Sequence, residues 1–232
     1  MKSVRYATAL VLILLAALIN LNPDSVDPTN ASQIDPNAGE TDLVGLQESE
    51  EWLVLRVAFP DKPYSDSKID NIFDTDEDGS PHMSASQYVA QMSGGLSSLE
   101  VTISEGTWVS QMDEGFWGAD SSGIRDSGLD GRGVEGLVEE SVEGLLDGVN
   151  LSKWDYNNDG LVDRLLILHS GSAQESGASS DSIWSHFSEL QDPIKVGEWT
   201  IGHYTISSLD SGMGTVVHEM LHQMGAVDLY DV

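Results

Sequence analysis

Apolar residues in this chain gather in short runs and amphipathic stretches, with polar loops between them. The segment from Trp52 to Phe59 reads WLVLRVAF and stops at Pro60. Because it is rich in β-branched and large apolar residues, it predicts a strand. Other apolar or alternating segments predict further strands at 98–109 (a strand or a hairpin), 162–169 and 198–208.

Helical patterns occupy the intervals between these strands. Ser84 and Gln87 have the spacing of a capping box at the start of a short helix that a Gly-Gly pair ends. Apolar residues recur with helical spacing over 134–149, and a last helix is expected at 214–224. Because strands and helices alternate irregularly, the sequence predicts an α+β fold, a mixed twisted sheet packed with helices.

The N-terminus combines two basic residues, Lys2 and Arg5, with an apolar run at 7–19. Residues 1–20 therefore predict a signal peptide or, if uncleaved, an N-terminal anchor. We expect the protein to be secreted or anchored at the cell surface, outside the cytoplasm, with no other membrane span. Residues 21–45 are rich in Pro, Asn, Asp and Ser and predict a flexible polar tether or a short pro-segment, and residues 46–232 predict the folded domain.

The charge of the chain is strongly negative, with 39 acidic against 10 basic residues and a formal net charge of -29. Since like charges repel, this balance argues against nucleic acid as a partner. The chain has no cysteine, which excludes disulfides and thiolate metal ligands. The oligomeric state has no signature in the sequence.

The segment HEMLH carries the clearest chemistry. It places His218 and His222 four residues apart, on one face of the predicted last helix. Zinc takes imidazole nitrogen at about 2.0–2.1 Å, so two rings one turn apart can share one ion. Glu219 lies beside this pair and can reach a metal-bound water without binding the metal itself. Apolar neighbours predict a buried helix, in which these polar groups need the compensation that a metal ion supplies.

A glycine and an aspartate extend this motif. Gly225 can take the left-handed cap that ends a helix and turns the chain, which would bring Asp228 back toward the metal. The resulting pattern, H-E-x-x-H-x-x-G-x-x-D, is the metzincin type with aspartate in place of the third histidine. Three protein ligands leave one position for water. The alternative is a chance HExxH in a core helix, and the added glycine and aspartate argue against it.

At these residues the chain resembles the immune inhibitor A-type secreted metallopeptidases, a peptidase family (M-six) of the zincin clan. The resemblance covers Trp52 to Asp231 and includes VLRVAFPDKPY, SASQYVAQMSGGLSSLEVTISEGTWV, WDYNNDGLVDRLLILHSG, IWSHF and HEMLHQMGAVDLYD. It implies a zincin-like catalytic domain that acts as a zinc-dependent endopeptidase on protein or peptide substrates. It also implies that the zinc ligands are His218, His222 and Asp228. Glu219 would be the catalytic general base.

The end of the chain affects this interpretation. In zincins of this type, a methionine turn and a C-terminal subdomain follow the third ligand and form the floor of the cleft. Only four residues follow Asp228. We therefore expect the C-terminal subdomain to be missing and the catalytic domain to be truncated at its C-terminus, with weak zinc binding and poor cleavage.

A second cation site is expected in the segment DYNNDGLVD. Positions 1, 3, 5, 7 and 9 of an EF-hand-like loop would be Asp155, Asn157, Asp159, Leu161 (through its carbonyl) and Asp163. A glycine stands at position 6, but position 12 is not glutamate and no EF-hand helix follows. The sequence therefore predicts a calcium-stabilised loop. The alternative is a turn closed by Asn and Asp side chains without an ion.

Two functions from different classes fit these features. The first is a zinc endopeptidase, and the second is a non-catalytic, metal-stabilised surface or binding module derived from such a peptidase. A hydrolase with the same metal chemistry and another substrate is favoured less by the helix motif. The intact Glu219 favours the enzyme, because a purely structural metal site has no need of a general base. Cleavage preference and the oxyanion-stabilising group have no signature in the sequence.

Overall fold

The computed structural model describes residues 43–73, 83–121 and 123–228. By its contacts the chain divides into a unit of residues Thr41–Val227 and a second unit that joins Met1–Glu40 to Asp228–Val232. The predicted signal or anchor segment (1–20) and nearly all of the predicted tether (21–45) lie outside the described residues, so both stay predictions. Within the described ranges, no helix is long and apolar enough to cross a membrane.

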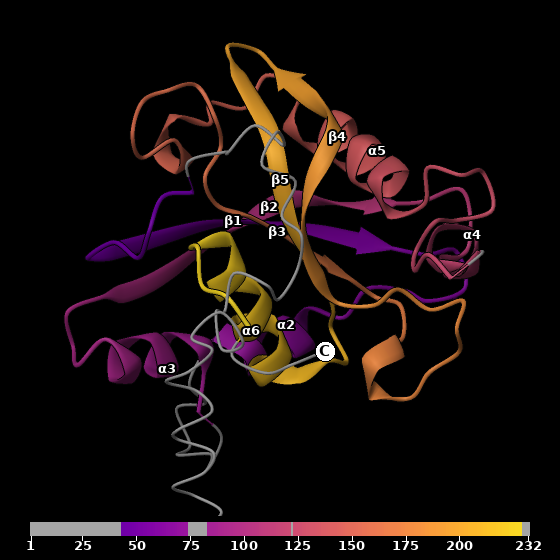
Figure 1. The fold of residues 1–232 in the computed structure, drawn as a ribbon, viewed down its shortest axis with the longest axis horizontal. Coiled ribbons are helices and arrows are strands. Elements are labelled where there is room, and N and C mark those ends of the chain that lie inside the picture. Colours follow the sequence, from indigo (N-terminus) through magenta and orange to yellow (C-terminus); the bar gives the residue numbers. More distant parts are fainter. Residues whose placement is uncertain (1–42, 74–82, 122, 229–232) are drawn as a thin grey trace, which may run out of the picture. The chain divides into compact units, whose positions relative to one another are not determined.

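A five-stranded mixed sheet organises the unit Thr41–Val227 (Figure 1). Its strands are β1 (Ser49–Ala58), β2 (Ser98–Val109), β3 (Leu165–His169), β4 (His186–Val196) and β5 (Trp199–Ser208). Their order in space is β2-β1-β3-β5-β4. Neighbouring strands are parallel except β4, which runs antiparallel to β5 at one edge. The predicted mixed sheet is therefore confirmed.

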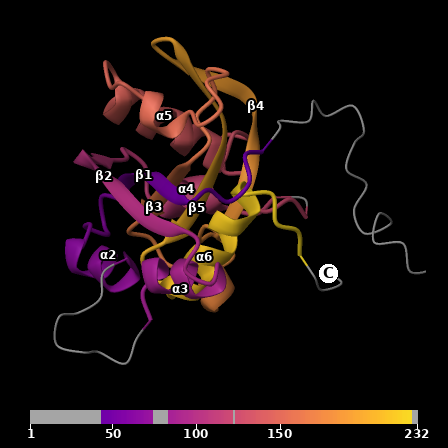
Figure 2. The same cartoon turned by 90° about the vertical axis from the view of Figure 1, so that its left-hand side faces the viewer.

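Helices cover both faces of this sheet, as Figure 1 and Figure 2 show. The helical elements are α2 (Asp66–Phe73), α3 (Ala85–Met92), α4 (Glu114–Gly118), α5 (Val134–Leu146), η3 (Ser152–Trp154), η4 (Gln174–Ser176) and α6 (Gly212–Gln223). On one face α5 packs against β1, β2 and β4. On the other face α6 lies on β4 and β5, and α2 and α3 pack against it.

Both faces of the sheet bury apolar side chains. Along β1, Leu53 and Leu55 belong to the core beneath α5, whereas Trp52 and Val54 belong to the core on the α6 side. Successive side chains of a strand point to opposite faces, so a strand with two covered faces can be apolar at consecutive positions, as β1 and β3 are. The two covered faces explain the continuous apolar runs in the sequence.

The predicted elements occur within a few residues of their expected positions. The capping box of α3 is confirmed, because the Ser84 hydroxyl accepts from the Gln87 amide while the Ser84 amide donates to the Gln87 side chain. Helix α5 ends before the predicted limit at residue 149, because Gly148 takes a left-handed backbone with φ +71°. The segment 98–109 forms one strand, β2, and not a hairpin.

The sequence pattern does not indicate β4, α2 or α4. As an edge strand, β4 carries many exposed polar residues and contains Pro193, so it has no apolar run. Only three residues of α2 are buried, Ile69, Ile72 and Phe73, and α4 spans a single turn. Segments this short do not establish a helical period.

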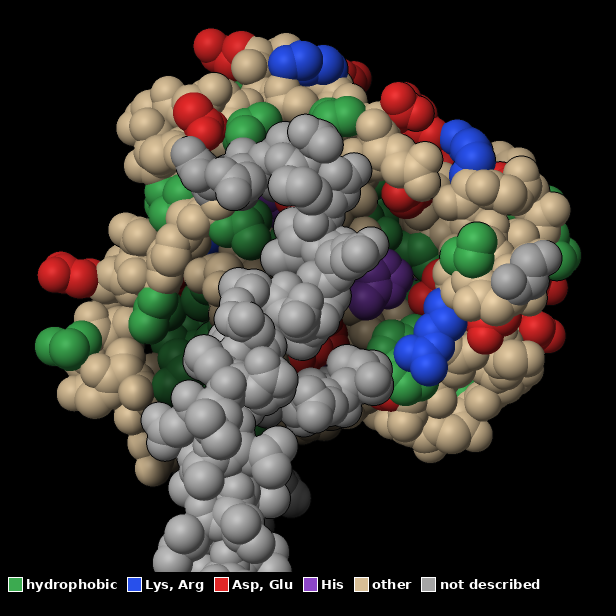
Figure 3. Space-filling model, in the orientation of Figure 1, with side chains coloured by type: hydrophobic (Ala, Val, Ile, Leu, Met, Phe, Trp, Pro, Cys, Tyr) green, Lys and Arg blue, Asp and Glu red, His purple; other side chains and the backbone are tan. Residues whose placement is uncertain are grey.

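Acidic side chains are spread over the surface. On the face drawn in Figure 3, Asp and Glu lie scattered among apolar and uncharged groups, with few Lys and Arg between them. This distribution fits the net charge of -29. That the charge excludes nucleic acid stays a prediction.

Glu50 and Arg164 form an ion pair whose side chains are both 0% exposed. Arg164 donates through Nε to Glu50 Oε2 (2.7 Å) and through Nη2 to Glu50 Oε1 (3.2 Å). The same Nη2 donates to the carbonyls of Val44 (2.7 Å) and Gly45 (3.0 Å). Trp52 Nε1 also donates to the Glu50 carboxylate (3.1 Å). The pair thereby joins β1, the start of β3 and the segment before β1.

We expect Glu50→Leu to lower the free energy of unfolding by about 3–5 kcal/mol, because it leaves the Arg164 guanidinium buried without its counter-charge. Urea denaturation followed by circular dichroism measures this change. The control Glu139→Gln breaks the exposed pair of Arg132 and Glu139 and should change the same quantity by less than about 1 kcal/mol. Equal effects of the two substitutions would contradict the prediction.

Candidate metal centre

Helix α6 carries the HEMLH segment. Apolar side chains bury it against the sheet and the neighbouring helices: Val216, Val217, Met220 and, at the C-cap, Met224. Each such side chain contributes roughly 1.5–3 kcal/mol when fully buried. The helix ends at Gln223, and Gly225, directly after the C-cap, takes the predicted left-handed backbone (φ +86°) and donates its amide to the His222 carbonyl (2.9 Å). The Ala226 amide donates to the Leu221 carbonyl (3.0 Å), which completes a Schellman cap.

The two histidines of HEMLH face each other, as their spacing predicts. Nε2 of His218 lies 3.1 Å from Nε2 of His222. Nδ1 of His222 lies 2.8 Å from the carbonyl oxygen of Ala226, which can only accept, so Nδ1 carries a proton. With the proton on Nδ1, Nε2 is the nitrogen of His222 that faces His218. Metal-binding histidines have this orientation, with the other ring nitrogen donating to a carbonyl or carboxylate.

Glu219 is buried, with 8% of its surface exposed. Its Oε2 accepts a hydrogen bond from the backbone amide of Phe187 on β4 (3.2 Å). Its Oε1 lies 3.9 Å from Nε2 of His218. One carboxylate oxygen is therefore held by the edge strand while the other lies beside the histidine pair.

These donors fit a zinc ion. Among the described residues, one group of at least three His, Cys, Asp or Glu side chains has its potential ligand atoms within 4.8 Å of one another. Its members are His218, Glu219 and His222. Two nitrogens that bind one tetrahedral zinc at about 2.0–2.1 Å are about 3.3 Å apart, close to the separation of the two Nε2 atoms. Two nitrogen lone pairs at that distance repel unless a proton or a metal ion lies between them.

Two residues separate the site predicted from the sequence from the site in the structure, Asp228 and Phe187. Asp228 belongs to the second unit, with residues 1–40, so its role as third ligand stays a prediction. Phe187 contributes only a backbone amide, and that amide meets Glu219 because β4 lies beside α6. No residue type or spacing in the sequence could have indicated this contact.

The predicted calcium loop is closed by its own side chains. The Asp159 amide donates to Oδ1 of Asp155 (3.1 Å) and to Oδ1 of Asn157 (3.2 Å), and the Leu161 amide donates to Oδ1 of Asp159 (2.8 Å). Burial raises the pKa of Asp163, and the charges of Asp159 and Asp155 add to this effect. Within the described part of the chain these aspartates do not make a ligand group like that of HEMLH. Calcium stays a prediction.

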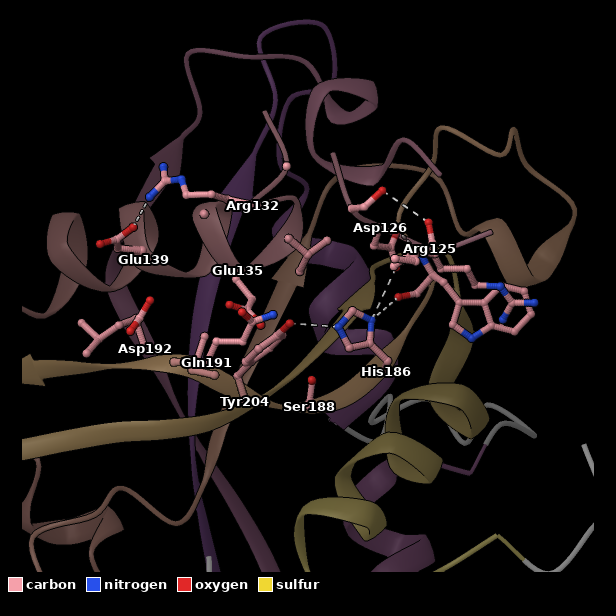
Figure 4. Close-up of a pocket in the computed structure, with 18 residues that line it drawn as sticks. Arg125, Asp126, Arg132, Glu135, Glu139, His186, Ser188, Gln191, Asp192 and Tyr204 are labelled. Carbon is pink, nitrogen blue, oxygen red and sulfur yellow. Dashed lines mark hydrogen bonds and ion pairs between the residues drawn. The ribbon is translucent and has the colours of Figure 1, made fainter. Parts of the chain in front are cut away.

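A cavity of about 810 Å³ lies on the α5 side of the sheet (Figure 4). His186 and Tyr204 line it, with Nε2 of the histidine 3.0 Å from the tyrosine hydroxyl. Their chain neighbours, Phe187 on β4 and His203 on β5, direct their rings to the other face of the sheet. There the two rings pack edge to face with centroids 5.8 Å apart. The sheet therefore separates this cavity from the histidine pair of α6.

Asp126 is the most perturbed carboxyl group of this cavity. It is almost buried, and its two oxygens accept from the amide of Trp184 at 3.3 Å. Burial raises the pKa of Asp126 from 3.8 to about 7, against the opposing effects of this hydrogen bond and of Arg125. Nδ1 of His186 lies 3.6 Å from Oδ2 of Asp126. No motif in the sequence marks Asp126.

His169 and His186 remain outside the metal centre. His169 is 0% exposed, its Nδ1 accepts from the Gly171 amide (3.1 Å), and burial lowers its pKa to about 3. His186 faces the cavity on the α5 side, where burial lowers its pKa. Both therefore act as neutral structural side chains in this arrangement.

A helix with two converging imidazoles and a buried glutamate, packed against a mixed sheet, is typical of metal-dependent peptidases. The model of the family described as "Immune inhibitor A peptidase M6, catalytic domain" matches residues 71–232. The chain belongs to this peptidase family, and the resemblance found in its sequence is confirmed.

Two curated relatives agree with this assignment. Immune inhibitor A of Bacillus thuringiensis is 29% identical over 188 residues, which cover 67% of this chain and 26% of the relative. The pre-pro-metalloprotease PrtV of Vibrio cholerae is 25% identical over 240 residues, which cover 81% of this chain and 26% of the relative. The chain thus spans about a quarter of the length of the relatives that it matches.

Asp126→Asn should change how stability depends on pH. Because the pKa of Asp126 is raised in the folded state, folding takes up a proton between about pH 4 and pH 7, and stability falls by about 1.4 kcal/mol per pH unit there. Asparagine does not titrate and tolerates the left-handed backbone at this position (φ +52°). The variant should therefore become more stable relative to the parent as pH rises from 4.5 to 8.

Urea denaturation of both proteins at several pH values measures this difference. Asp70→Asn, at an exposed position of α2, serves as the control, and its difference from the parent should stay constant. A constant difference for Asp126→Asn as well would contradict the assignment of a raised pKa.

Calcium binding by the DYNNDGLVD loop has its own test. If the loop binds calcium, millimolar Ca²⁺ should raise the melting temperature, because a ligand that binds only the folded state stabilises it. Asp159→Asn keeps the acceptor that bonds to the Leu161 amide but removes a charge, so it should abolish the calcium-dependent shift. A calorimetric titration without heat, together with an unchanged melting temperature, would exclude calcium here.

Proposed function

We propose that this chain carries the catalytic site of a zinc-dependent endopeptidase that hydrolyses peptide bonds in protein substrates. The imidazoles of His218 and His222 and the carboxylate of Asp228 would hold the ion. Membership of the peptidase family supports the reaction class, and the convergence of the two Nε2 atoms supports the metal.

Glu219 has the position of a general base in this proposal. A bound zinc ion would lower the pKa of a water molecule and polarise the scissile carbonyl. Oε1 of Glu219 would accept a proton and later donate it to the nitrogen of the leaving amine. Oε2 would meanwhile keep its hydrogen bond to the Phe187 amide, which orients the carboxylate.

The burial of Glu219 is the observation that carries this proposal. A carboxylate that is only 8% exposed loses most of its hydration, which destabilises the folded state. A metal ion that only stabilises the fold requires no carboxylate outside its ligand set. A general base does require such a group beside the metal, held in one orientation. The arrangement therefore favours the enzyme over the metal-stabilised binding module.

We also propose that the protein acts outside the cytoplasm. The basic start and apolar run of residues 1–20 support export, as a signal peptide or an N-terminal anchor. The two relatives are much longer than this chain, so their complete activities are not transferred to it.

Glu219→Gln tests the role of the base. The variant keeps the shape and the acceptor for the Phe187 amide but cannot take up the proton, so peptide hydrolysis should fall by about 10²–10⁴-fold. Zinc binding, measured by competition with a chromogenic chelator, should remain. His222→Ala is the matched variant that should lose zinc and activity together. Undiminished hydrolysis by Glu219→Gln would refute the assignment, and zinc binding without hydrolysis by the parent chain would favour the binding module.

A further inference from the structure

A buried glutamine stands at the end of α6. Gln223 is 0% exposed and follows Glu219 by four residues, so both side chains lie on the helix face that meets β4 and β5. His222 precedes it in the chain and is part of the more exposed face that carries the histidine pair. Gln223 thus lies behind the candidate metal centre, outside its ligand set.

Gln223 bonds to two side chains of β5. The Thr205 hydroxyl donates to its Oε1 (3.0 Å), and its Nε2 donates to Nδ1 of His203 (2.7 Å). Because an amide nitrogen only donates, Nδ1 of His203 must accept, and the ring proton is on Nε2. Burial lowers the pKa of His203 to about 4, so this acceptor is available near neutral pH.

The same groups lead back to Glu219. The Thr205 hydroxyl lies 3.4 Å from the Glu219 carbonyl oxygen. The ring of His203 packs against the ring of Phe187, whose backbone amide donates to the Glu219 carboxylate. We name these residues the backing network: Phe187, His203, Thr205, Glu219 and Gln223. It links the helix to both strands of the β4–β5 hairpin.

Apolar packing alone would leave the rotation of α6 poorly defined. Hydrophobic contacts have no preferred direction, whereas hydrogen bonds weaken steeply when their geometry changes. A side chain about 5–6 Å from a helix axis moves by about 1 Å when the helix turns by about 10°. That displacement is enough to break the 3.2 Å bond between Glu219 and the Phe187 amide.

We propose that Gln223 is a positioning residue for Glu219: its bonds to Thr205 and His203 fix the rotation of α6, so that the carboxylate meets the Phe187 amide. This inference rests on the proposed function for its catalytic consequence. The geometric part concerns only residues of α6 and the β4–β5 hairpin, and it can be measured without metal or substrate.

Gln223→Met tests the proposal, since methionine has similar length and packs in apolar surroundings but makes neither bond. Hydrogen exchange of the Phe187 amide in the metal-free full chain, followed by nuclear magnetic resonance, should accelerate toward the rate in Glu219→Ala. In the zinc-loaded chain, kcat should fall by about 10²-fold, as expected for a displacement of about 1 Å, with KM and zinc affinity within a few-fold of the parent.

Two further variants separate positioning from general destabilisation. Thr205→Val removes one bond of the network from the opposite side while keeping the shape, so it should reproduce both effects and should not add to those of Gln223→Met. Met220→Leu alters a buried apolar residue of the same helix outside the network, so it should leave Phe187 exchange and kcat unchanged.

The outcomes distinguish this inference from the proposed function. Unchanged exchange at Phe187 in both Gln223→Met and Thr205→Val overturns the positioning role. If Gln223→Met does not fold, Thr205→Val alone decides the question by the same measurements. If the parent chain hydrolyses no peptide, the proposed function fails, while accelerated exchange at Phe187 still supports the positioning of the Glu219 side chain by Gln223.

Discussion

The buried pair of Glu50 and Arg164 aligns the strands on which the rest of the structure is built. Arg164 directly precedes β3, the central strand, and binds a carboxylate on β1 and the chain before it. A charge without exposure to water must keep its partner, so β1 and β3 cannot slide past each other without breaking this pair. Because β3 pairs with β5 on its other side, the same register determines where β5 supports α6.

Helix α6 has one face that packs on the core and the β4–β5 hairpin and another, more exposed face that carries the histidine pair. Its apolar residues anchor it to the core, and the Glu219–Gln223 face makes directional bonds to the hairpin. His218 and His222 lie on a more exposed face, where a metal ion and a substrate could reach them. Gly225 completes the arrangement, since its left-handed turn places the Ala226 carbonyl within reach of the ring of His222.

The parts of this structure that depend on a local pattern of residues can be predicted from the sequence. The continuous apolar runs make β1 and β3 evident, and β5 is recognisable from its mixture of β-branched, aromatic and polar residues. The spacing of His218 and His222 gives their shared face. The edge strand β4 lacks such a pattern, and the contact of Phe187 with Glu219 joins segments that only the fold brings together. In the predicted calcium loop, the spacing of Asn and Asp residues is enough to predict a turn. It does not determine whether each carboxylate points toward an ion or toward a backbone amide of the loop.

Glu219, and not any of the proposed zinc ligands, is the residue that best distinguishes the proposed enzyme from a metal-stabilised binding module. Two imidazoles and a carboxylate suffice to hold zinc in either case. A second carboxylate, that of Glu219, is buried beside them and bonded to a strand amide, which adds a desolvation penalty. A metal site that only stabilises the fold does not need this second carboxylate. The backing network adds further buried polar groups to hold that carboxylate in one place. A fixed orientation of this kind is what the proposed role of Glu219 requires, because a general base must meet the reacting group at a defined position.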